Sequence, residues 1–301
     1  MRPGTTLLLL VALALGTGCR RERKPVAHSK TEAADAAFPA KPPSGVVQFR
    51  VPRLTDVSDT AVRSSVIRGH AILEATGDSL PANVGNSLRC TSCHFAGGTV
   101  PNAMPWVGVY ARFPQYRPRS GRVDLIENRI NDCFERSMNG RALPADSREM
   151  HDIVAYLAFL SYGIPGGAQV NGQGLPKLPR LGADTVRGST LFTARCARCH
   201  GAAGGGTALA PPLWGPTSYN IGAGMARRSV MAAFIHALMP FDSPGTLGAQ
   251  QAYDIAAYVN SRPRPDFPGK EKDWPHGGAP DDVAYSIQSA STLGSSRRPP
   301  R

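Results

Sequence analysis

Two copies of a Cys-X-X-Cys-His motif constrain this 301-residue chain more than any other feature. They are Cys90-Thr-Ser-Cys93-His94 and Cys196-Ala-Arg-Cys199-His200. Two thiols at this spacing can form thioether bonds to the vinyl groups of one haem, and the histidine that follows is then placed against the iron. Two copies therefore predict two covalently bound haem c groups. The four motif cysteines are the expected attachment residues, and His94 and His200 are the expected iron ligands.

A sulfur-containing residue follows each motif at the same interval. Cys133 lies 43 positions after Cys90, and Met239 lies 43 positions after Cys196. This match predicts unlike sixth ligands, a thiolate at the first iron and a thioether at the second. A thiolate sulfur is also a nucleophile, so the first haem is expected to be catalytic and the second to transfer electrons. The alternative ligands are three nearby methionines, Met138, Met225 and Met231.

The motifs lie in two halves that repeat each other. Arg68-Gly69 precedes the first motif and Arg187-Gly188 precedes the second, and both halves later carry an Asp-Ile-X-Ala-Tyr sequence. Around that sequence, apolar residues recur at helical spacing in 150–160 and 252–259, and Asp146 is the expected cap of the first of these helices. The sequence has no long alternating strand pattern. It therefore predicts an all-α fold of two tandem class I cytochrome c-like domains, each with one covalent haem c.

Composition divides the chain into segments. Residues 5–15 form an apolar run that is too short to span a bilayer but typical of a signal peptide. Small residues before Cys19 resemble a lipobox, so we expect a periplasmic protein with Cys19 as a candidate lipid anchor. The expected boundaries are a signal peptide at 1–19, a flexible tether at 20–50, cytochrome c domain 1 at 51–163, a linker at 164–181, cytochrome c domain 2 at 182–275 and a disordered tail at 276–301.

Arginines are concentrated between residues 112 and 148, where there are eight of them and no lysine. Arg129 and Arg136 stand at −4 and +3 from Cys133, so on a helix both would lie near its face. A guanidinium group offers a planar fork of donors to oxyanions. We therefore expect Arg129, Arg136 and Arg141 to bind a small anionic sulfur compound. Arg117, Arg119 and Arg148 are expected on a solvated face. The net charge of +12 comes with no nucleic-acid motif, so no nucleic-acid partner is expected.

Two stretches resemble the di-haem thiosulfate dehydrogenase family. They are 128–140, Asn-Arg-Ile-Asn-Asp-Cys-Phe-Glu-Arg-Ser-Met-Asn-Gly, and 262–275, which ends in Lys-Asp-Trp-Pro. The resemblance implies that Cys133 ligates the catalytic haem and Met239 the electron-transfer haem. Leu238 stands where some members carry a lysine that can replace the methionine. The resemblance also implies oxidation of two thiosulfates to tetrathionate, or the reverse reaction. Electrons would pass from the first haem to the second and on to an external acceptor such as another cytochrome c.

Three other functions compete with this one. A haem subunit for sulfur transfer in a thiosulfate-oxidising complex generally has cysteine at its second haem too, whereas no cysteine follows Cys199 here. A non-enzymatic periplasmic electron shuttle would have no use for Cys133. The same residue argues against a di-haem peroxidase, which needs an open distal position.

Overall fold

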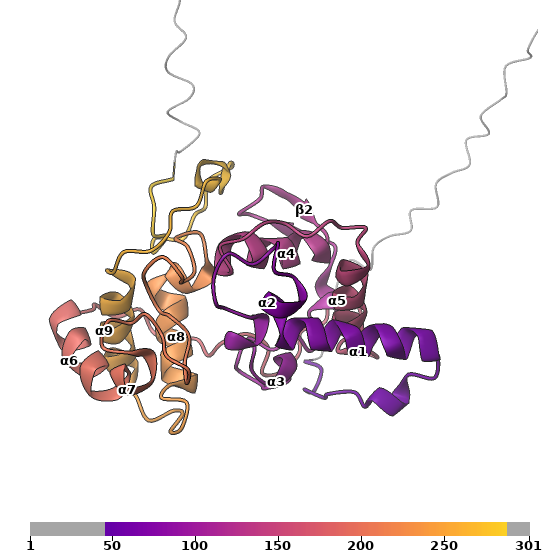
Figure 1. Cartoon of the computed structure of the whole chain (residues 1–301), viewed down its shortest axis with the longest axis horizontal. Coiled ribbons are helices and arrows are strands. Elements are labelled where there is room, and N and C mark those ends of the chain that lie inside the picture. Colours follow the sequence, from indigo (N-terminus) through magenta and orange to yellow (C-terminus); the bar gives the residue numbers. More distant parts are fainter. Residues whose placement is uncertain (1–45, 288–301) are drawn as a thin grey trace, which may run out of the picture. The chain divides into compact units, whose positions relative to one another are not determined.

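The computed structural model describes residues 46–287, so the expected signal peptide, Cys19 and the outer parts of the tether and tail lie outside the described residues. Figure 1 labels helices α1 to α9 and strand β2 on a chain coloured along the sequence. The elements in chain order are η1 (Leu54–Asp56), α1 (Thr60–Glu74), α2 (Thr76–Ser79), η2 (Cys90–Ser92), α3 (Phe95–Gly98), η3 (Tyr110–Arg112), β1 (Gln115–Arg117), β2 (Arg122–Asp124), α4 (Ile126–Asp132), η4 (Cys133–Ser137), α5 (Arg148–Phe159), α6 (Thr185–Arg195), α7 (Ala197–His200), η5 (Gly224–Ala226), α8 (Arg228–Leu238), α9 (Ala249–Asn260) and η6 (Lys270–Lys272).

The first half is built on the packing of α1 against α5 (Figure 1). The apolar stripe predicted for α5 is buried, with Met150 and Ile153 fully inaccessible. The helix begins one residue later than expected. Ser147 rather than Asp146 is its N-cap, and the Ser147 hydroxyl accepts a hydrogen bond from the backbone N–H of Met150 at 3.2 Å. A hydroxyl at this position satisfies one of the amides that the first helical turn leaves without a partner.

The second half repeats this arrangement with α6 and α8 packed on α9. Its predicted stripe is buried throughout, from Ala252 to Val259. Within residues 46–287 the only sheet is the antiparallel pair of β1 and β2, three residues each, in which Tyr116 pairs with Val123. The predicted all-α class is confirmed.

The repeated Arg-Gly and Asp-Ile sequences meet in space. In the first half, Arg68 donates to both carboxylate oxygens of Asp152 at 2.7 Å. In the second half, Arg187 donates to Asp254 at 2.9 and 3.1 Å. Burial alone would raise the pKa of each carboxyl, but the hydrogen bonds that each accepts and the charge of its arginine together outweigh burial, so the pKa of both aspartates lies below the usual range. One ion pair therefore ties the early helix to the late helix in each domain.

We expect Asp254→Asn to lower the free energy of unfolding by about 2 kcal/mol at neutral pH, because Arg187 loses a charged acceptor. The carboxyl pKa is lower in the folded state, so this stabilisation is complete above the unfolded pKa and is lost as the pH falls through the folded value. Urea unfolding of the wild type and the variant should converge between about pH 5 and pH 2. The exposed carboxyl of Asp146 provides the control, and Asp146→Asn should match the wild type.

Two expected boundaries differ from the structure. Val47, expected in the tether, forms a parallel bridge with Val170, and its N–H donates to the carbonyl of Gln169 at 2.9 Å. Residues 276–287, expected in a disordered tail, make side-chain contacts: Asp282 accepts from Arg227 at 2.9 Å. Polar composition suggested a solvated tail, but these polar groups pair with arginines of the folded domain. Segment 164–181 contains turns and the Val170 bridge but no helix.

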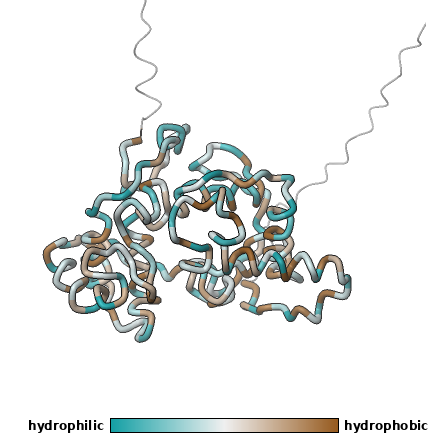
Figure 2. The backbone as a smooth tube through the Cα atoms, in the orientation of Figure 1, coloured by the Kyte–Doolittle hydropathy of each residue, from teal (hydrophilic) through white to brown (hydrophobic). Residues whose placement is uncertain are grey.

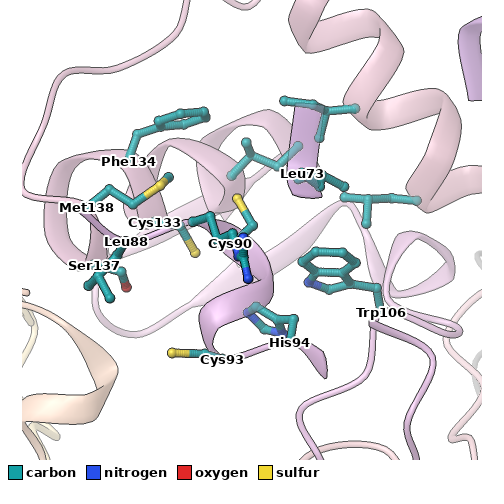
Figure 3. A pocket seen from close by; sticks show the side chains of 14 residues that line it. Leu73, Leu88, Cys90, Cys93, His94, Trp106, Cys133, Phe134, Ser137 and Met138 are labelled. Carbon is teal, nitrogen blue, oxygen red and sulfur yellow. The ribbon is translucent and has the colours of Figure 1, made fainter. Parts of the chain in front are cut away.

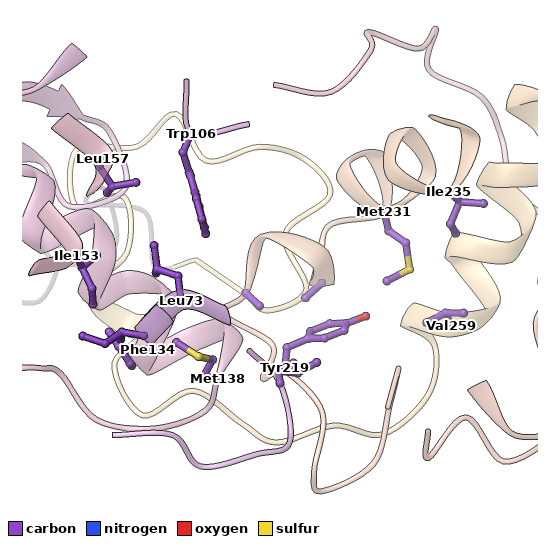
Figure 4. Close-up of a cluster of buried hydrophobic side chains, with 14 of the residues drawn as sticks. Leu73, Trp106, Phe134, Met138, Ile153, Leu157, Tyr219, Met231, Ile235 and Val259 are labelled. Carbon is purple, nitrogen blue, oxygen red and sulfur yellow. The ribbon is translucent and has the colours of Figure 1, made fainter. Parts of the chain in front are cut away.

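Apolar side chains of both halves form one continuous core. It includes Phe134 and Met138 near the first haem motif and Met231 and Ile235 of α8 (Figure 4). Along the chain, hydrophobic and hydrophilic residues alternate over short distances (Figure 2). Among the described residues, none of the helices has the length and apolar character needed to cross a membrane.

Candidate active site

Both motif histidines are held by a backbone carbonyl a short distance along the chain. His94 Nδ1 lies 2.6 Å from the carbonyl oxygen of Met104, and His200 Nδ1 lies 2.8 Å from that of Pro211. A carbonyl oxygen can only accept, so Nδ1 carries the proton and Nε2 keeps its lone pair. This is how ligating histidines are commonly oriented.

Burial keeps these imidazoles neutral. It lowers the pKa of His94 to about 4, and it lowers the pKa of His200 as well. A neutral imidazole is the form that binds a metal. Both histidines are therefore suited to ligate iron at neutral pH, and their role as iron ligands stays a prediction.

The first motif lines a largely apolar cavity (Figure 3). Cys90, Cys93 and His94 lie on one part of its lining, and the Trp106 ring centroid is 4.7 Å from that of His94. Burial raises the pKa of the Cys90 and Cys93 thiols to about 12, so both are held in the neutral form. The apolar lining, the two thiols and the oriented histidine fit a covalently bound haem.

Cys133 reaches the same cavity from another element (Figure 3). It begins η4, a single turn of π-helix in which the N–H of Met138 donates to the Cys133 carbonyl at 2.9 Å. Such turns often occur at functional sites because they change the direction of the side chains that follow. The rival ligand Met138 lines the cavity too and is 2% exposed. Ligation by Cys133 is thus compatible with the structure and stays a prediction.

Arg129 is the direct neighbour of the Cys133 sulfur. Its Nη1 lies 2.8 Å from Cys133 Sγ, one helical turn away. The charge of Cys133 is the main cause that raises the pKa of Arg129 above its usual value. A guanidinium in this position stabilises sulfur in the anionic form.

The second domain repeats the design of the first. Trp214 packs edge-on against Tyr258, with ring centroids 5.8 Å apart, as Trp106 packs against Tyr156 at 6.2 Å. Met239 follows α8 and is half-buried, whereas Met231 lies within α8 and is 2% exposed. Both Met225 and Met239 contact a small apolar cluster that also includes Cys93. Met239 as the ligand of the second haem stays a prediction.

A second cavity is lined by Arg129 and Ser137, on either side of Cys133 in the sequence, and five of its eleven lining residues are arginines. Ser137 lines this cavity and the haem cavity, so the two are neighbours. We call it the arginine cavity. Its five arginines are Arg117, Arg119, Arg129, Arg136 and Arg227.

Sequence reasoning missed three of these arginines. A solvated face was expected for Arg117 and Arg119, and this is wrong: their side chains are 22% and 17% exposed. Arg227 lies outside the arginine-rich stretch of 112–148, so the composition of that stretch does not point to it. The signal for the first two was present in the arginine-rich composition, but the β1–β2 hairpin that turns them inward was not predicted.

Arg136 and Arg141 have different surroundings from Arg129. Arg136 donates to both oxygens of Asp273 at 2.7 Å and to Asp132 at 3.1 Å, so each of its three guanidinium nitrogens already makes a hydrogen bond. The π-turn after Cys133 departs from the regular helix on which both flanking arginines were expected to face the sulfur. Arg141 is exposed, and its backbone N–H donates to Asn83 at 3.1 Å. Their roles in anion binding stay predictions.

The positive charge of the arginines in this cavity is only partly balanced by neighbouring carboxylates. Burial and then the charge of Arg129 lower the pKa of Arg117, and burial and then the charge of Arg136 lower the pKa of Arg119. A lowered arginine pKa means that the surroundings destabilise the charged, protonated form of the side chain. An anion in the cavity would remove that penalty, so the site is suited to anionic ligands.

The two helical units, each with a haem motif and an oriented histidine, define a tandem cytochrome c. Family models agree: the one described as "SoxA/TsdA, cytochrome c domain" matches residues 82–165, and the one described as "Cytochrome c" matches 185–263. The chain belongs to the thiosulfate dehydrogenase family, as curated relatives over most of its length show.

Two relatives and one solved structure illustrate the similarity. The thiosulfate dehydrogenase of Allochromatium vinosum is 45% identical over 242 residues, which cover 77% of this chain and 89% of that protein. That of Psychrobacter arcticus is 40% identical over 270 residues, covering 87% and 82%. The solved thiosulfate dehydrogenase TsdBA of Marichromatium purpuratum has a TM-score of 0.69 at 34% identity over 73% of this chain. This chain spans 50% of that structure's length.

Proposed function

We propose that this protein oxidises two thiosulfate dianions to one tetrathionate dianion at Cys133. One observation carries the proposal: Cys133 Sγ lies in the haem cavity and touches Arg129, which lines the arginine cavity. A nucleophilic sulfur therefore stands between the place where electrons are accepted and the place where anions bind. The family membership of the chain supports the same reaction.

The reaction needs two steps at Cys133. In the first, the Cys133 thiolate and one thiosulfate form a sulfur–sulfur bond, and two electrons leave. In the second, the outer sulfur of another thiosulfate attacks the sulfur now attached to Cys133. The bond to Cys133 breaks, tetrathionate leaves and the thiolate is restored. Atoms and charges balance without a proton, so the site requires no general acid or base.

The arginines reduce the repulsion between the reacting anions. Two dianions and a thiolate repel one another strongly at contact distance when water is excluded. Arg129 stabilises the Cys133 sulfur as an anion and as the leaving group of the second step. Arg117, whose carboxylate neighbours Asp124 and Asp132 are 3.7 and 3.5 Å away, is available to an entering anion.

The two haems, when bound, accept electrons one at a time. Cys93, Phe95, Phe234 and Met239 contact one apolar cluster that joins the first haem motif to the predicted ligand of the second haem. This contact supports electron flow from the first haem to the second and on to an external acceptor such as another cytochrome c. The same site would run in reverse as a tetrathionate reductase. We also propose a periplasmic location with an anchor at Cys19.

The test is thiosulfate-dependent reduction of an artificial acceptor by the purified di-haem protein, with tetrathionate quantified. One tetrathionate per two electrons is the expected result. Turnover without tetrathionate, or no turnover by protein with both haems attached, would contradict the proposal. If there is no turnover, a ferric spectrum with thiolate bands would point to sulfur transfer. A ferric spectrum without thiolate bands would point to an electron shuttle.

We expect Arg129→Gln to lower kcat/KM for thiosulfate by roughly 100-fold, since a partly buried charged donor to the reacting sulfur is lost. Glutamine keeps much of the side-chain volume, so both haems should stay attached. Arg112 lies in the same arginine-rich stretch but is exposed, and Arg112→Gln is the matched control. The measurement is kcat/KM for thiosulfate in the wild type, Arg129→Gln and Arg112→Gln. Equal losses in both variants would show a general charge effect rather than a role for Arg129.

A further inference from the structure

The chain after α9 returns to the arginine cavity, where Trp274 lies against Arg119. The N–H of Trp274 donates to the Arg119 carbonyl at 2.8 Å, and the Arg119 guanidinium carbon lies 4.6 Å from the centre of the indole ring. Trp274 is 5% exposed and lines the cavity. Its backbone φ of 53° is in the left-handed region, which a bulky residue rarely adopts. Such strained positions are often part of functional sites.

Stacking on an aromatic face leaves the donors of a guanidinium free. The Arg119 guanidinium carbon lies over the Trp274 ring, and a guanidinium group carries five N–H donors in its own plane. Within residues 46–287, the Arg119 side chain makes one hydrogen bond, from Nη1 to the carbonyl of Gly222 at 2.9 Å. Arg119 therefore keeps in-plane donors that an oxyanion could use.

The nearest carboxylate is already occupied. Asp273 lies 3.9 Å from Arg119 Nε, but it accepts two hydrogen bonds from Arg136 at 2.7 Å and one from the Tyr285 hydroxyl. Burial, followed by the contact with Asp273, raises the pKa of Tyr285 to about 12, so its hydroxyl stays a donor. The carboxylate is thus directed at Arg136, and the charge of Arg119 is left for another partner.

We propose that Arg119 holds the second thiosulfate in a separate subsite of the arginine cavity, and that Trp274 is a positioning residue that fixes Arg119 there. The subsite rests on the proposed function, which needs two anions of the same kind. Arg129 serves the anion attached to Cys133, and Arg119, stacked on Trp274, serves the anion that attacks it. The same subsite binds one sulfonate end of tetrathionate before release.

The experiment compares Arg119→Gln, Trp274→Leu and Trp274→Phe with the wild-type holoprotein. The first readout is calorimetric binding of tetrathionate to the ferric protein, which is independent of turnover. We expect about 10-fold weaker binding for Arg119→Gln and Trp274→Leu, and near wild-type binding for Trp274→Phe, which keeps an aromatic face. Tyr162, which is 73% exposed, supplies the control Tyr162→Leu, expected to bind like the wild type.

The second readout separates the two anions. Rapid mixing with thiosulfate and no acceptor should reduce the haems equally fast in Arg119→Gln and in the wild type, because only the first anion takes part. Steady-state turnover should instead need about 10-fold more thiosulfate for half saturation, at little cost in kcat. A merely structural role for Trp274 would disturb both readouts and would not be rescued by phenylalanine.

The outcomes distinguish the two proposals. If the wild type forms tetrathionate and both Arg119→Gln and Trp274→Leu bind it with wild-type affinity, the subsite is overturned while the proposed function stands. If the wild type neither forms nor binds tetrathionate, both are overturned. If Trp274→Leu does not fold, Arg119→Gln and Trp274→Phe decide the matter.

Discussion

Cys133→Met should lower the rate of tetrathionate formation by at least about 1,000-fold, because a thioether cannot act as a nucleophile or as a leaving thiolate. Methionine is still able to ligate iron, so both haems should remain attached and reducible by dithionite. The measurement is kcat with thiosulfate, together with the ferric near-infrared and electron-spin spectra. Loss of turnover should coincide with loss of the thiolate signals at the first haem.

Met138→Leu distinguishes the two candidate ligands in the same cavity. Leucine has a similar volume but no sulfur, so the cost in stability should be small, below about 1.5 kcal/mol. If Cys133 is the ligand, the thiolate signals survive this substitution. A Cys133→Met protein with full turnover would remove Cys133 from the mechanism, and a Met138→Leu protein without thiolate signals would contradict the ligand assignment.

Gly69→Ala should destabilise the first domain by about 3 kcal/mol or more, the upper range for overpacking a close contact. A Cβ at this position would lie 1.9 Å from the carbonyl oxygen of Asp152, which is backbone and cannot rotate away. The equivalent Gly188 would place a Cβ 2.0 Å from the Asp254 carbonyl oxygen. Each glycine therefore allows the early helix to approach the late helix of its own domain.

Thermal unfolding of the di-haem proteins, followed in the haem absorption band, would measure the effect. Gly77 in α2 is the matched control, since a Cβ there meets no atom within 4 Å. Gly77→Ala should leave the midpoint unchanged or raise it slightly, because alanine favours a helix over glycine. Equal midpoints for Gly69→Ala and Gly77→Ala would mean that the early and late helices separate at little cost.

Local spacing explains what could be predicted. The haem motifs work through five consecutive residues, and a helical stripe needs only a period of 3.6, so both can be read without tertiary information. The repeated Arg-Gly and Asp-Ile sequences of the two halves also indicated that the domains are duplicated. Arg68-Gly69 and Asp152 were noticed as repeated sequences, and the structure shows that they are one contact made twice. The all-α class and the tandem arrangement followed from these features.

Contacts between distant parts of the chain explain what was missed. Arg136 was expected to face the Cys133 sulfur, but its fork binds Asp273, which is 137 positions away in the sequence. Arg119 was expected in solvent, but the β1–β2 hairpin and Trp274 enclose it. No local pattern reveals which arginine of eight will find a carboxylate, since all have the same chemistry.

The sequence by itself thus predicted where two haems would attach and which sulfur residues are candidates to face them, and it determined that the domains are helical and duplicated. These properties depend on covalent chemistry and on spacing along one helix or one loop. Only the tertiary structure decided which arginines line the arginine cavity and which are held by carboxylates. That choice depends on burial and on hydrogen bonds and ion pairs between segments more than 100 residues apart, where packing of the whole domain sets the distances.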